Sequence, residues 1–130
     1  SQHGFAVYAI AAQAAGAPLR VASCHPDDHS MPRGHDLDAI AATIADTTRL
    51  VHLANPNNPT GVLADPAELR RFMLAVPPSV LVFVDEAYLE LSKGGVEANS
   101  MAPLTKVRKN LVVSRTFSKV YGMAALRMGG

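Results

Sequence analysis

VLVFVDEAY, residues 80–88, places five consecutive apolar residues directly before two acidic ones. An unbroken apolar run of this length is typical of a strand in a parallel sheet that is covered on both faces. Residues 50–54 and 111–114 are two further short apolar runs, and stretches with helical patterns separate the three. This alternation predicts an α/β fold of three layers, with a mostly parallel central sheet between helices.

Capping and breaking residues place the helices around these strands. Glycine and proline follow an alanine-rich segment, an aspartate can cap a second segment, and a proline suits the first turn of a third. The predicted helices are residues 5–15, residues 37–44 behind Asp36, and Pro66 to about Val76. The other predictions are a short strand over 19–23, a loop over 24–34 and mostly irregular chain over 94–103.

Length and composition limit the class of protein. The chain has 130 residues, of which 48% are hydrophobic and 18% charged, as expected of one ordered domain or part of one. No apolar run approaches the ~20 residues of a membrane span. The first four residues lack a basic signal-peptide segment, and the single cysteine, Cys24, cannot form an internal disulfide. We therefore expect a soluble, cytoplasmic protein without a membrane partner.

Charge is distributed unevenly along the chain. Residues 1–97 carry six basic and all eleven acidic side chains, whereas residues 98–130 carry six basic side chains and no acid. A cationic segment attracts anions, so a non-enzymatic anion-binding or nucleic-acid-binding module is one candidate function. Only Phe117 and Tyr121 could stack on bases there, so this alternative is less favoured and we expect no nucleic-acid partner.

Polar residues follow each of the three predicted strands. The segments are Asn55-Pro56-Asn57-Asn58-Pro59-Thr60-Gly61, Asp85-Glu86-Ala87-Tyr88 and Ser114-Arg115-Thr116-Phe117-Ser118-Lys119. Open parallel sheets bind ligands beyond the carboxyl ends of their strands. Asn58, Asp85 and Lys119 are separated by 27 and 34 residues, and one βαβ unit takes ~30 residues. We therefore expect the three segments to face one cleft.

Asp85 and Lys119 are the candidate chemical groups. A carboxylate at the end of an apolar strand needs a cation or a strong donor, such as a protonated aromatic nitrogen of a cofactor. A cap on the following turn is the alternative for Asp85. A lysine in a partly dry, basic cleft becomes a nucleophilic amine able to form an imine, although most lysines are solvated. Thr116, Ser118 and Arg127 could cradle a phosphate.

The asparagine loop and the histidines have alternative interpretations. Two prolines stiffen residues 55–61 and Gly61 accepts a positive φ, so the loop can hold the Asn58 amide in place. A tight turn without a ligand is the alternative. His25, His29 and His35 lie near acidic residues, but no metal-binding pattern accompanies them. We expect these histidines in a solvated loop, with no metal site.

Three motifs occur in a fixed order: Asn-Pro-Thr-Gly at 58–61, Asp-x-x-Tyr at 85–88 and Thr-Phe-Ser-Lys at 116–119, with Arg127 eight residues beyond the lysine. This set resembles the fold-type I pyridoxal-phosphate aminotransferases of classes I and II. Asn-Pro-Asn-Asn-Pro-Thr-Gly and Arg-Thr-Phe-Ser-Lys, with Ala-x-Leu-Arg at 124–127, look most like the histidinol-phosphate aminotransferase branch. The resemblance covers the chain essentially from end to end.

The resemblance implies pyridoxal 5'-phosphate as the cofactor and a role for each motif residue. Lys119, the catalytic residue, would form an aldimine with the cofactor and carry a proton during amino transfer, while Asp85 would pair with the pyridinium nitrogen. The other implied cofactor contacts are Asn58 and Tyr88 at the phenolic oxygen, Phe5 stacked on the ring, and Thr116, Ser118 and Arg127 at the phosphate. An ordinary apolar position on the first helix is the alternative for Phe5.

The resemblance also implies a larger protein. Residues 1–130 would be the central part of its large, cofactor-binding domain, without the small substrate-binding domain, and would be inactive or bind cofactor weakly alone. The full-length enzyme would be a homodimer in amino-acid biosynthesis. It would pass an amino group from a small-molecule amino acid or amino alcohol phosphate, such as histidinol phosphate, to a 2-oxo acid such as 2-oxoglutarate. An aromatic amino-acid aminotransferase and a related pyridoxal-phosphate decarboxylase are the enzymatic alternatives.

Overall fold

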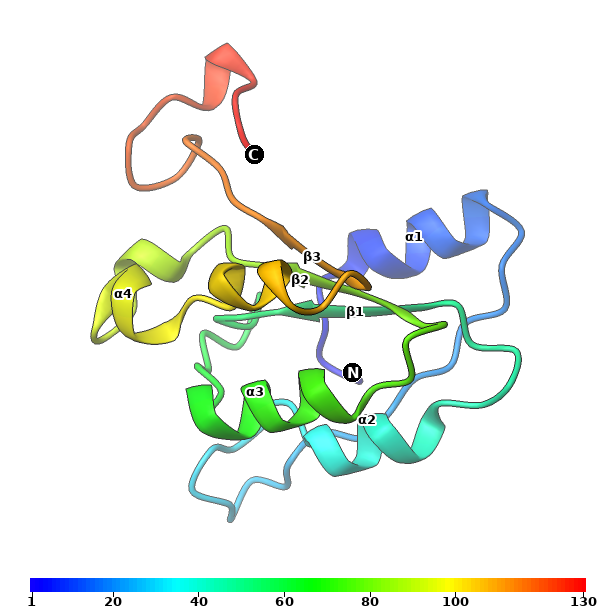
Figure 1. Ribbon diagram of the computed structural model, residues 1–130. Helices are drawn as coiled ribbons and strands as arrows, with labels where there is room; N and C mark the ends of the chain where they lie inside the picture. Colours follow the sequence, from blue (N-terminus) through cyan, green and yellow to red (C-terminus); the bar gives the residue numbers. More distant parts are fainter.

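The computed structural model describes all 130 residues and contains a parallel sheet of three strands in the order β1-β2-β3 (Figure 1). The strands are β1, Leu50–Ala54, β2, Leu81–Asp85, and β3, Leu111–Ser114. Val51 pairs with Val82, which pairs with Leu111, so alternate residues of all three strands share a face. The predicted parallel α/β sheet is confirmed, and β2 begins one residue after the start of the apolar run.

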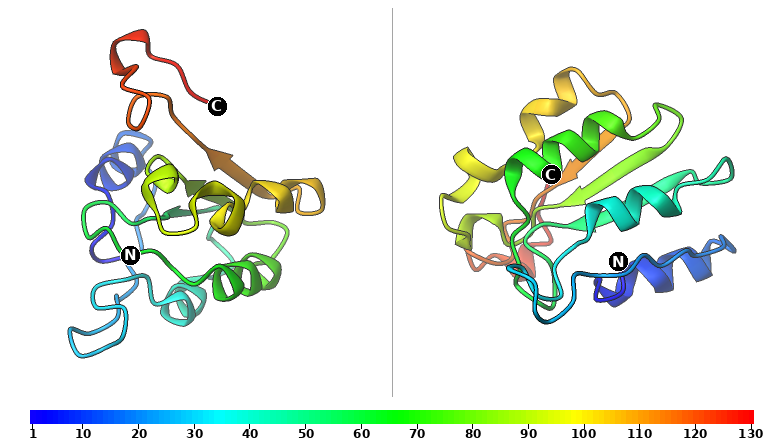
Figure 2. Two further views of the ribbon diagram at one scale, coloured as in Figure 1. Left: turned by 90° about the vertical axis from the view of Figure 1, so that its left-hand side faces the viewer. Right: turned by 90° about the horizontal axis from the view of Figure 1, so that it is seen from below.

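Helices lie on both sides of the sheet (Figure 2). The α-helices are α1, Ala6–Ala14, α2, Leu37–Thr43, α3, Pro66–Ala75, and α4, Gly95–Asn99. Three short 3-10 helices are η1, Leu89–Leu91, η2, Ala102–Lys106, and η3, Ala124–Leu126. None of these helices combines the length and the apolar character needed to cross a bilayer.

The boundaries of the first three helices follow the predicted signals. Asp36 caps α2 by accepting a hydrogen bond of 2.8 Å from the backbone N–H of Ala39. Asp65 caps α3 in the same way, and Pro66 occupies the first turn. Gly16 follows α1 with a φ of +64°, the left-handed conformation that ends helices readily at glycine. These three helix predictions are confirmed to within one or two residues.

The hydrophobic core lies on one face of the sheet. Leu53, Val82 and Val84 are essentially inaccessible there and pack against buried side chains of α2, α3 and η2. On the opposite face Leu81 is 39% exposed, because only α1 lies over that side of the sheet. The prediction that β2 is covered on both faces is therefore wrong for this chain.

Two further predictions from the sequence are wrong. Residues 19–23 form no strand: Leu19 and Val21 are exposed, and the chain makes only a single antiparallel bridge nearby, between Cys24 and His35. Residues 94–103 are not mostly irregular, since they contain α4 and the start of η2. Partly buried hydrogen bonds of a side chain in this segment stabilise it. The Asn99 amide donates to the carbonyl oxygens of Lys93 and Gly95. The sequence pattern does not indicate these bonds.

His35 is buried rather than solvated, which corrects the interpretation of the histidine loop for this residue. Its Nε2 donates to the carbonyl oxygen of Ala54 at 2.7 Å, because a carbonyl can only accept. Its Nδ1 therefore accepts from the Ser1 hydroxyl at 2.8 Å. Burial lowers the pKa of His35 from 6.5 to about 4, despite the opposing effect of the bond to Ala54. His25 and His29 are half-buried and stack on each other.

His35 makes the stability of the fold depend on pH. Since its folded pKa of about 4 lies below the unfolded value of 6.5, its contribution is complete above pH 6.5 and is lost as the pH falls toward 4. Protonation costs up to about 1.4 kcal/mol per pH unit in this window. The free energy of unfolding of the protein carrying this sequence is measured by urea denaturation at several pH values between 4 and 7. We expect it to change less steeply with pH in His35→Gln than in the parent protein. His25→Gln is the control. If the free energy of unfolding depended equally on pH in the two variants, His35 would not be the source of the pH dependence.

Candidate functional site

The carboxyl ends of the three strands lie level at one edge of the sheet. Ala54, Asp85 and Ser114 are register partners. The pairing continues one step further, because the N–H of Asn55 donates to the Asp85 carbonyl and the N–H of Glu86 donates to the Ser114 carbonyl, both at 2.9 Å. The three polar segments therefore leave the sheet side by side, as their spacing predicts.

A small cavity of about 80 Å³ opens between these segments. Five of the predicted site residues line it: Phe5, Asn58, Asp85, Tyr88 and Lys119. They come from four places in the chain, namely the residue before α1, the asparagine loop, the end of β2 with its following turn, and the segment after β3. The fold thus brings together side chains that are up to 114 residues apart in the sequence.

A larger cavity of about 570 Å³ adjoins the small one and shares Pro56, Asn58 and Tyr88 with it. Its other walls are the rest of the asparagine loop and the chain from Leu91 to Lys93. Together the two cavities have the size of a site for a small molecule. Asn58 and Tyr88 stand at the boundary between them, where one side chain can contact a ligand in either.

Asp85 is surrounded by hydrogen-bond donors. Its Oδ1 accepts from the backbone N–H of Ala87 at 3.1 Å and from the Ser114 hydroxyl at 3.4 Å. Its Oδ2 accepts from the Tyr8 hydroxyl at 3.0 Å. The carboxylate therefore caps the following turn and lines the cavity at the same time, so the two interpretations of Asp85 are compatible. These donors fix the plane of the carboxylate while leaving it lone pairs for a further donor.

Tyr8 is a site residue that the sequence did not single out. Its ring stacks on His52 with centroids 4.8 Å apart and an angle of 13° between the planes. Burial, and then the charge of Asp85, raise the pKa of the Tyr8 hydroxyl, so it stays protonated and donates. Tyr8 lies three residues beyond Phe5, the N-cap of α1, and the two rings are in contact with centroids 5.7 Å apart. This spacing is the signal that could have found Tyr8.

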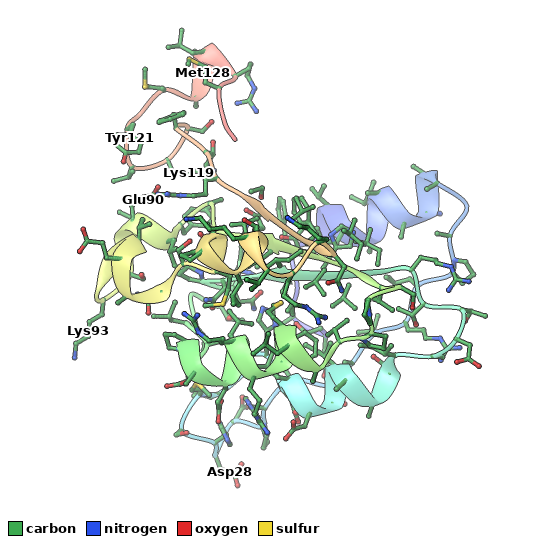
Figure 3. All side chains as sticks on the ribbon, viewed as in Figure 1. Asp28, Glu90, Lys93, Lys119, Tyr121 and Met128 are labelled. Carbon is green, nitrogen blue, oxygen red and sulfur yellow. The ribbon has the colours of Figure 1, made fainter.

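Lys119 lies beside the ring of Tyr88. Its Nζ is 5.2 Å from the ring centroid, within the range of a cation–π contact. Figure 3 shows Lys119 at the base of the C-terminal segment, on the side where Glu90 lies. The side chain is exposed, so these 130 residues do not supply the partly dry surroundings expected for this amine.

The three predicted phosphate ligands do not line either cavity. Thr116 uses its hydroxyl to accept from the backbone N–H of Ser118, and the Arg127 guanidinium donates to the Ala124 carbonyl. Residues 115–130 fold back on themselves and stand away from the body of the molecule (Figures 1 and 2). The apolar side chains of this segment, such as Leu126, are exposed, because no other part of the chain packs on them.

Two carboxylates near the site are held in place by the chain. Glu86 is buried, and accepts from the Ser100 hydroxyl and the Met101 N–H, both at 2.7 Å. Burial raises the pKa of Glu86, although these donors and the charge of Arg115 oppose the rise. Glu90 pairs with Arg115, whose Nη2 lies 2.5 Å from its Oε1. The sequence singled out neither carboxylate, because both depend on partners at least 14 residues away.

Comparison with known proteins identifies relatives along the whole chain. The family model described as "Aminotransferase class I and II" matches residues 1–130. The chain is 49% identical over 129 residues to "Histidinol-phosphate aminotransferase 2" of Ralstonia nicotianae and 48% identical over 126 residues to "Aromatic amino acid aminotransferase" of Mycolicibacterium smegmatis. These matches cover 99% and 96% of the chain but 33% of each relative. The chain therefore spans about a third of the length of the curated relatives it matches.

Solved structures show the same fold. The crystal structure of histidinol-phosphate aminotransferase from Sinorhizobium meliloti in complex with pyridoxal-5'-phosphate superposes with a TM-score of 0.83 at 30% identity. The superposition covers 99% of the chain and 33% of that structure. The α/β fold expected from the sequence, that of a fold-type I enzyme, is confirmed.

Removing the Tyr8 hydroxyl tests the contacts of Asp85. Tyr8→Phe keeps the stacked ring but leaves Asp85 Oδ2 without its donor, so we expect the free energy of unfolding to fall by about 1 kcal/mol. Tyr121→Phe is the matched control, because Tyr121 is exposed and its hydroxyl makes no hydrogen bond within the chain. Urea denaturation at neutral pH measures both variants. Equal effects of the two substitutions would show that the Tyr8–Asp85 bond does not stabilise the fold.

Proposed function

The chain belongs to the class I and II aminotransferase family, and we propose that the protein carrying it is a pyridoxal-phosphate-dependent aminotransferase. Residues 1–130 would form the central part of its large, cofactor-binding domain. One observation carries this proposal: Phe5, Asn58, Asp85, Tyr88 and Lys119 line one cavity at the carboxyl edge of a parallel sheet. A single aromatic ligand with a protonated ring nitrogen would contact all five.

The residues around the small cavity fit the ring of pyridoxal phosphate. Asp85 can only accept, and its fixed carboxylate suits a protonated ring nitrogen. The Asn58 amide and the Tyr88 hydroxyl are donors for a ring oxygen, and Phe5 offers an aromatic face. When bound, pyridoxal phosphate supplies an electron sink for the bond broken at the α-carbon of the substrate.

Lys119 would hold the cofactor through its amine and carry the proton at Nζ during the reaction. The ring of Tyr88 lies beside Nζ, 5.2 Å from the ring centroid, and keeps the amine at the wall of the cavity. Tyr8, Ser114 and the N–H of Ala87 keep Asp85 in one orientation while this occurs. The chemistry thus needs one movable group, the lysine, and one fixed group, the aspartate.

Thr116, Ser118 and Arg127 are the proposed ligands of the cofactor phosphate. All three belong to the cationic segment, residues 98–130, which has no acidic side chain to compete with an anion. Arg127 is bonded to its own turn and does not line the cavity. Phosphate binding by Arg127 therefore requires the chain beyond Lys119 to fold toward the cavity, which the phosphate charge itself would favour.

The names of the relatives support the proposed substrates. A histidinol-phosphate aminotransferase and an aromatic amino acid aminotransferase are almost equally similar to the chain. We propose a small-molecule amino donor, either an amino alcohol phosphate such as histidinol phosphate or an aromatic amino acid, and a 2-oxo acid such as 2-oxoglutarate as acceptor. We further propose that the full-length protein acts in amino-acid biosynthesis as a cytoplasmic homodimer.

Covalent trapping tests the role of Lys119. The protein carrying this sequence, mixed with pyridoxal phosphate and reduced with borohydride, should carry the cofactor on Lys119 in a peptide map by mass spectrometry. Lys119→Ala should abolish this label, whereas Lys106→Ala, at an exposed lysine on η2, should leave it intact. A label on Lys93, which lines the larger cavity, in place of Lys119 would contradict the assignment.

Turnover tests the reaction class. With 2-oxoglutarate as acceptor, histidinol phosphate and the aromatic amino acids are offered as donors, and glutamate formation is measured. Loss of the proton-carrying amine in Lys119→Ala should lower kcat by about a thousandfold. Carbon dioxide release from a phosphorylated amino acid, without glutamate formation, would identify the related decarboxylase and overturn the proposed transaminase.

A further inference from the structure

We propose that the ion pair between Glu90 and Arg115 positions Lys119 in the cavity. Arg115 directly follows β3, and Lys119 lies four residues further along the same segment. Glu90 lies two residues beyond Tyr88, whose ring is beside the Lys119 amine. The pair would act as a positioning device for the amine and would not touch the substrate. This inference rests on the proposed function, since it concerns the placement of the amine that the function uses.

Two contacts join the same two segments of chain. The Glu90–Arg115 pair joins η1 to the start of the segment after β3, and the Tyr88–Lys119 contact joins the preceding turn to the next part of that segment. The ion pair is the stronger of the two contacts, with 2.5 Å between Arg115 Nη2 and Glu90 Oε1. The contact of Nζ with the ring, at 5.2 Å from the centroid, is the weak member.

The burial of this ion pair distinguishes it from the others in the chain. The Glu90 side chain is 12% exposed and that of Arg115 is 35% exposed. The Arg33–Asp27 pair has side chains 60% and 72% exposed, and the third pair is similarly open. Exposed ion pairs contribute little to stability, because water and salt screen the attraction between their charges. A partly buried pair resists separation more, because the charge of Glu90 would be left largely desolvated without its partner.

The rest of the segment has no other polar attachment to the body of the molecule. Every hydrogen bond made by residues 116–130 ends within residues 115–130, including the bond from the Phe117 N–H to the Met128 carbonyl. The backbone of Arg115 pairs with Gly130 in the same way. The Arg115 side chain is therefore the single hydrogen-bonded link from this segment to the chain that carries Tyr88.

The surroundings of Arg115 leave it one strong partner. Its Nε is buried and has no hydrogen-bond partner, so the guanidinium is held by Glu90 alone. Glu86 acts on Arg115 through its charge without a hydrogen bond to it. Loss of Glu90 would free the guanidinium to turn toward Glu86 or toward water, and the start of the lysine segment would turn with it.

The test uses the protein carrying this sequence, with pyridoxal phosphate as the probe. Borohydride trapping across a range of pyridoxal phosphate concentrations gives an apparent dissociation constant for labelling at Lys119. Glu90→Gln and Arg115→Gln should each weaken labelling about tenfold, a factor that corresponds to about 1.4 kcal/mol. The double variant should lose no more than either single variant, because residues that act as one pair are not additive.

Two further variants separate positioning from a general loss of structure. Arg115→Lys keeps a positive charge opposite Glu90. Its apparent dissociation constant for labelling should lie within about threefold of the parent value, a smaller change than the tenfold loss expected for Arg115→Gln. Asp27→Asn, which removes the exposed ion pair with Arg33, should label as the parent does. Circular dichroism and the visible absorption band of the bound cofactor are recorded for each variant.

Three results would overturn the inference. They are parental labelling in both single glutamine variants, losses that multiply in the double variant, and no recovery in Arg115→Lys. Absence of any Lys119 label in the parent protein is a different outcome, which overturns the proposed function and this inference with it.

Discussion

The parallel register at the carboxyl edge of the sheet is the constraint on which the site depends. The backbone bonds from Asn55 to Asp85 and from Glu86 to Ser114 extend the pairing beyond the strands. Each polar segment therefore begins at the same level and turns over the same edge. A shift of one residue in β2 would move Asp85 to the other face of the sheet, because side chains alternate along a strand. No side chain at the site could compensate for such a shift.

Local signals in the sequence predict the parts of the fold that local energies determine. The apolar runs give the three strands, and Asp36, Pro66 and Gly16 give the ends of three helices, since capping and backbone preferences act within a few residues. The segment 19–23 has the composition of a strand, but a strand also needs a partner, and no pattern within five residues reports whether one is present. The sequence did not predict the helix α4, because part of its stability comes from specific side-chain bonds. The Asn99 amide donates to backbone carbonyls of this region, and helix propensities do not include such bonds.

The same distinction applies to the site. The motif order and the family resemblance predict Asn58, Asp85, Tyr88, Lys119 and Phe5, and the fold places all five around one cavity. Their chemical roles stay predictions. Glu90 is invisible to this reasoning, because its partner is 25 residues away. The spacing from Phe5 could have pointed to Tyr8, but not to its bond with Asp85, which spans 77 residues. Arg127 is the converse case, since its motif is recognisable while its position is set by a segment with no packing partner in the chain.

The attachment of α1 has a thermodynamic consequence. No residue of this helix is buried, and Tyr8 provides its hydrogen bond to the sheet. The acceptor is Oδ2 of Asp85, the carboxylate that also lines the cavity. A ligand that binds this carboxylate therefore changes the free energy of docking α1, and the docked helix changes the affinity for the ligand by the same factor, since linkage between binding events is reciprocal. A helix without a buried residue is in this way a reporter of occupancy at the cavity.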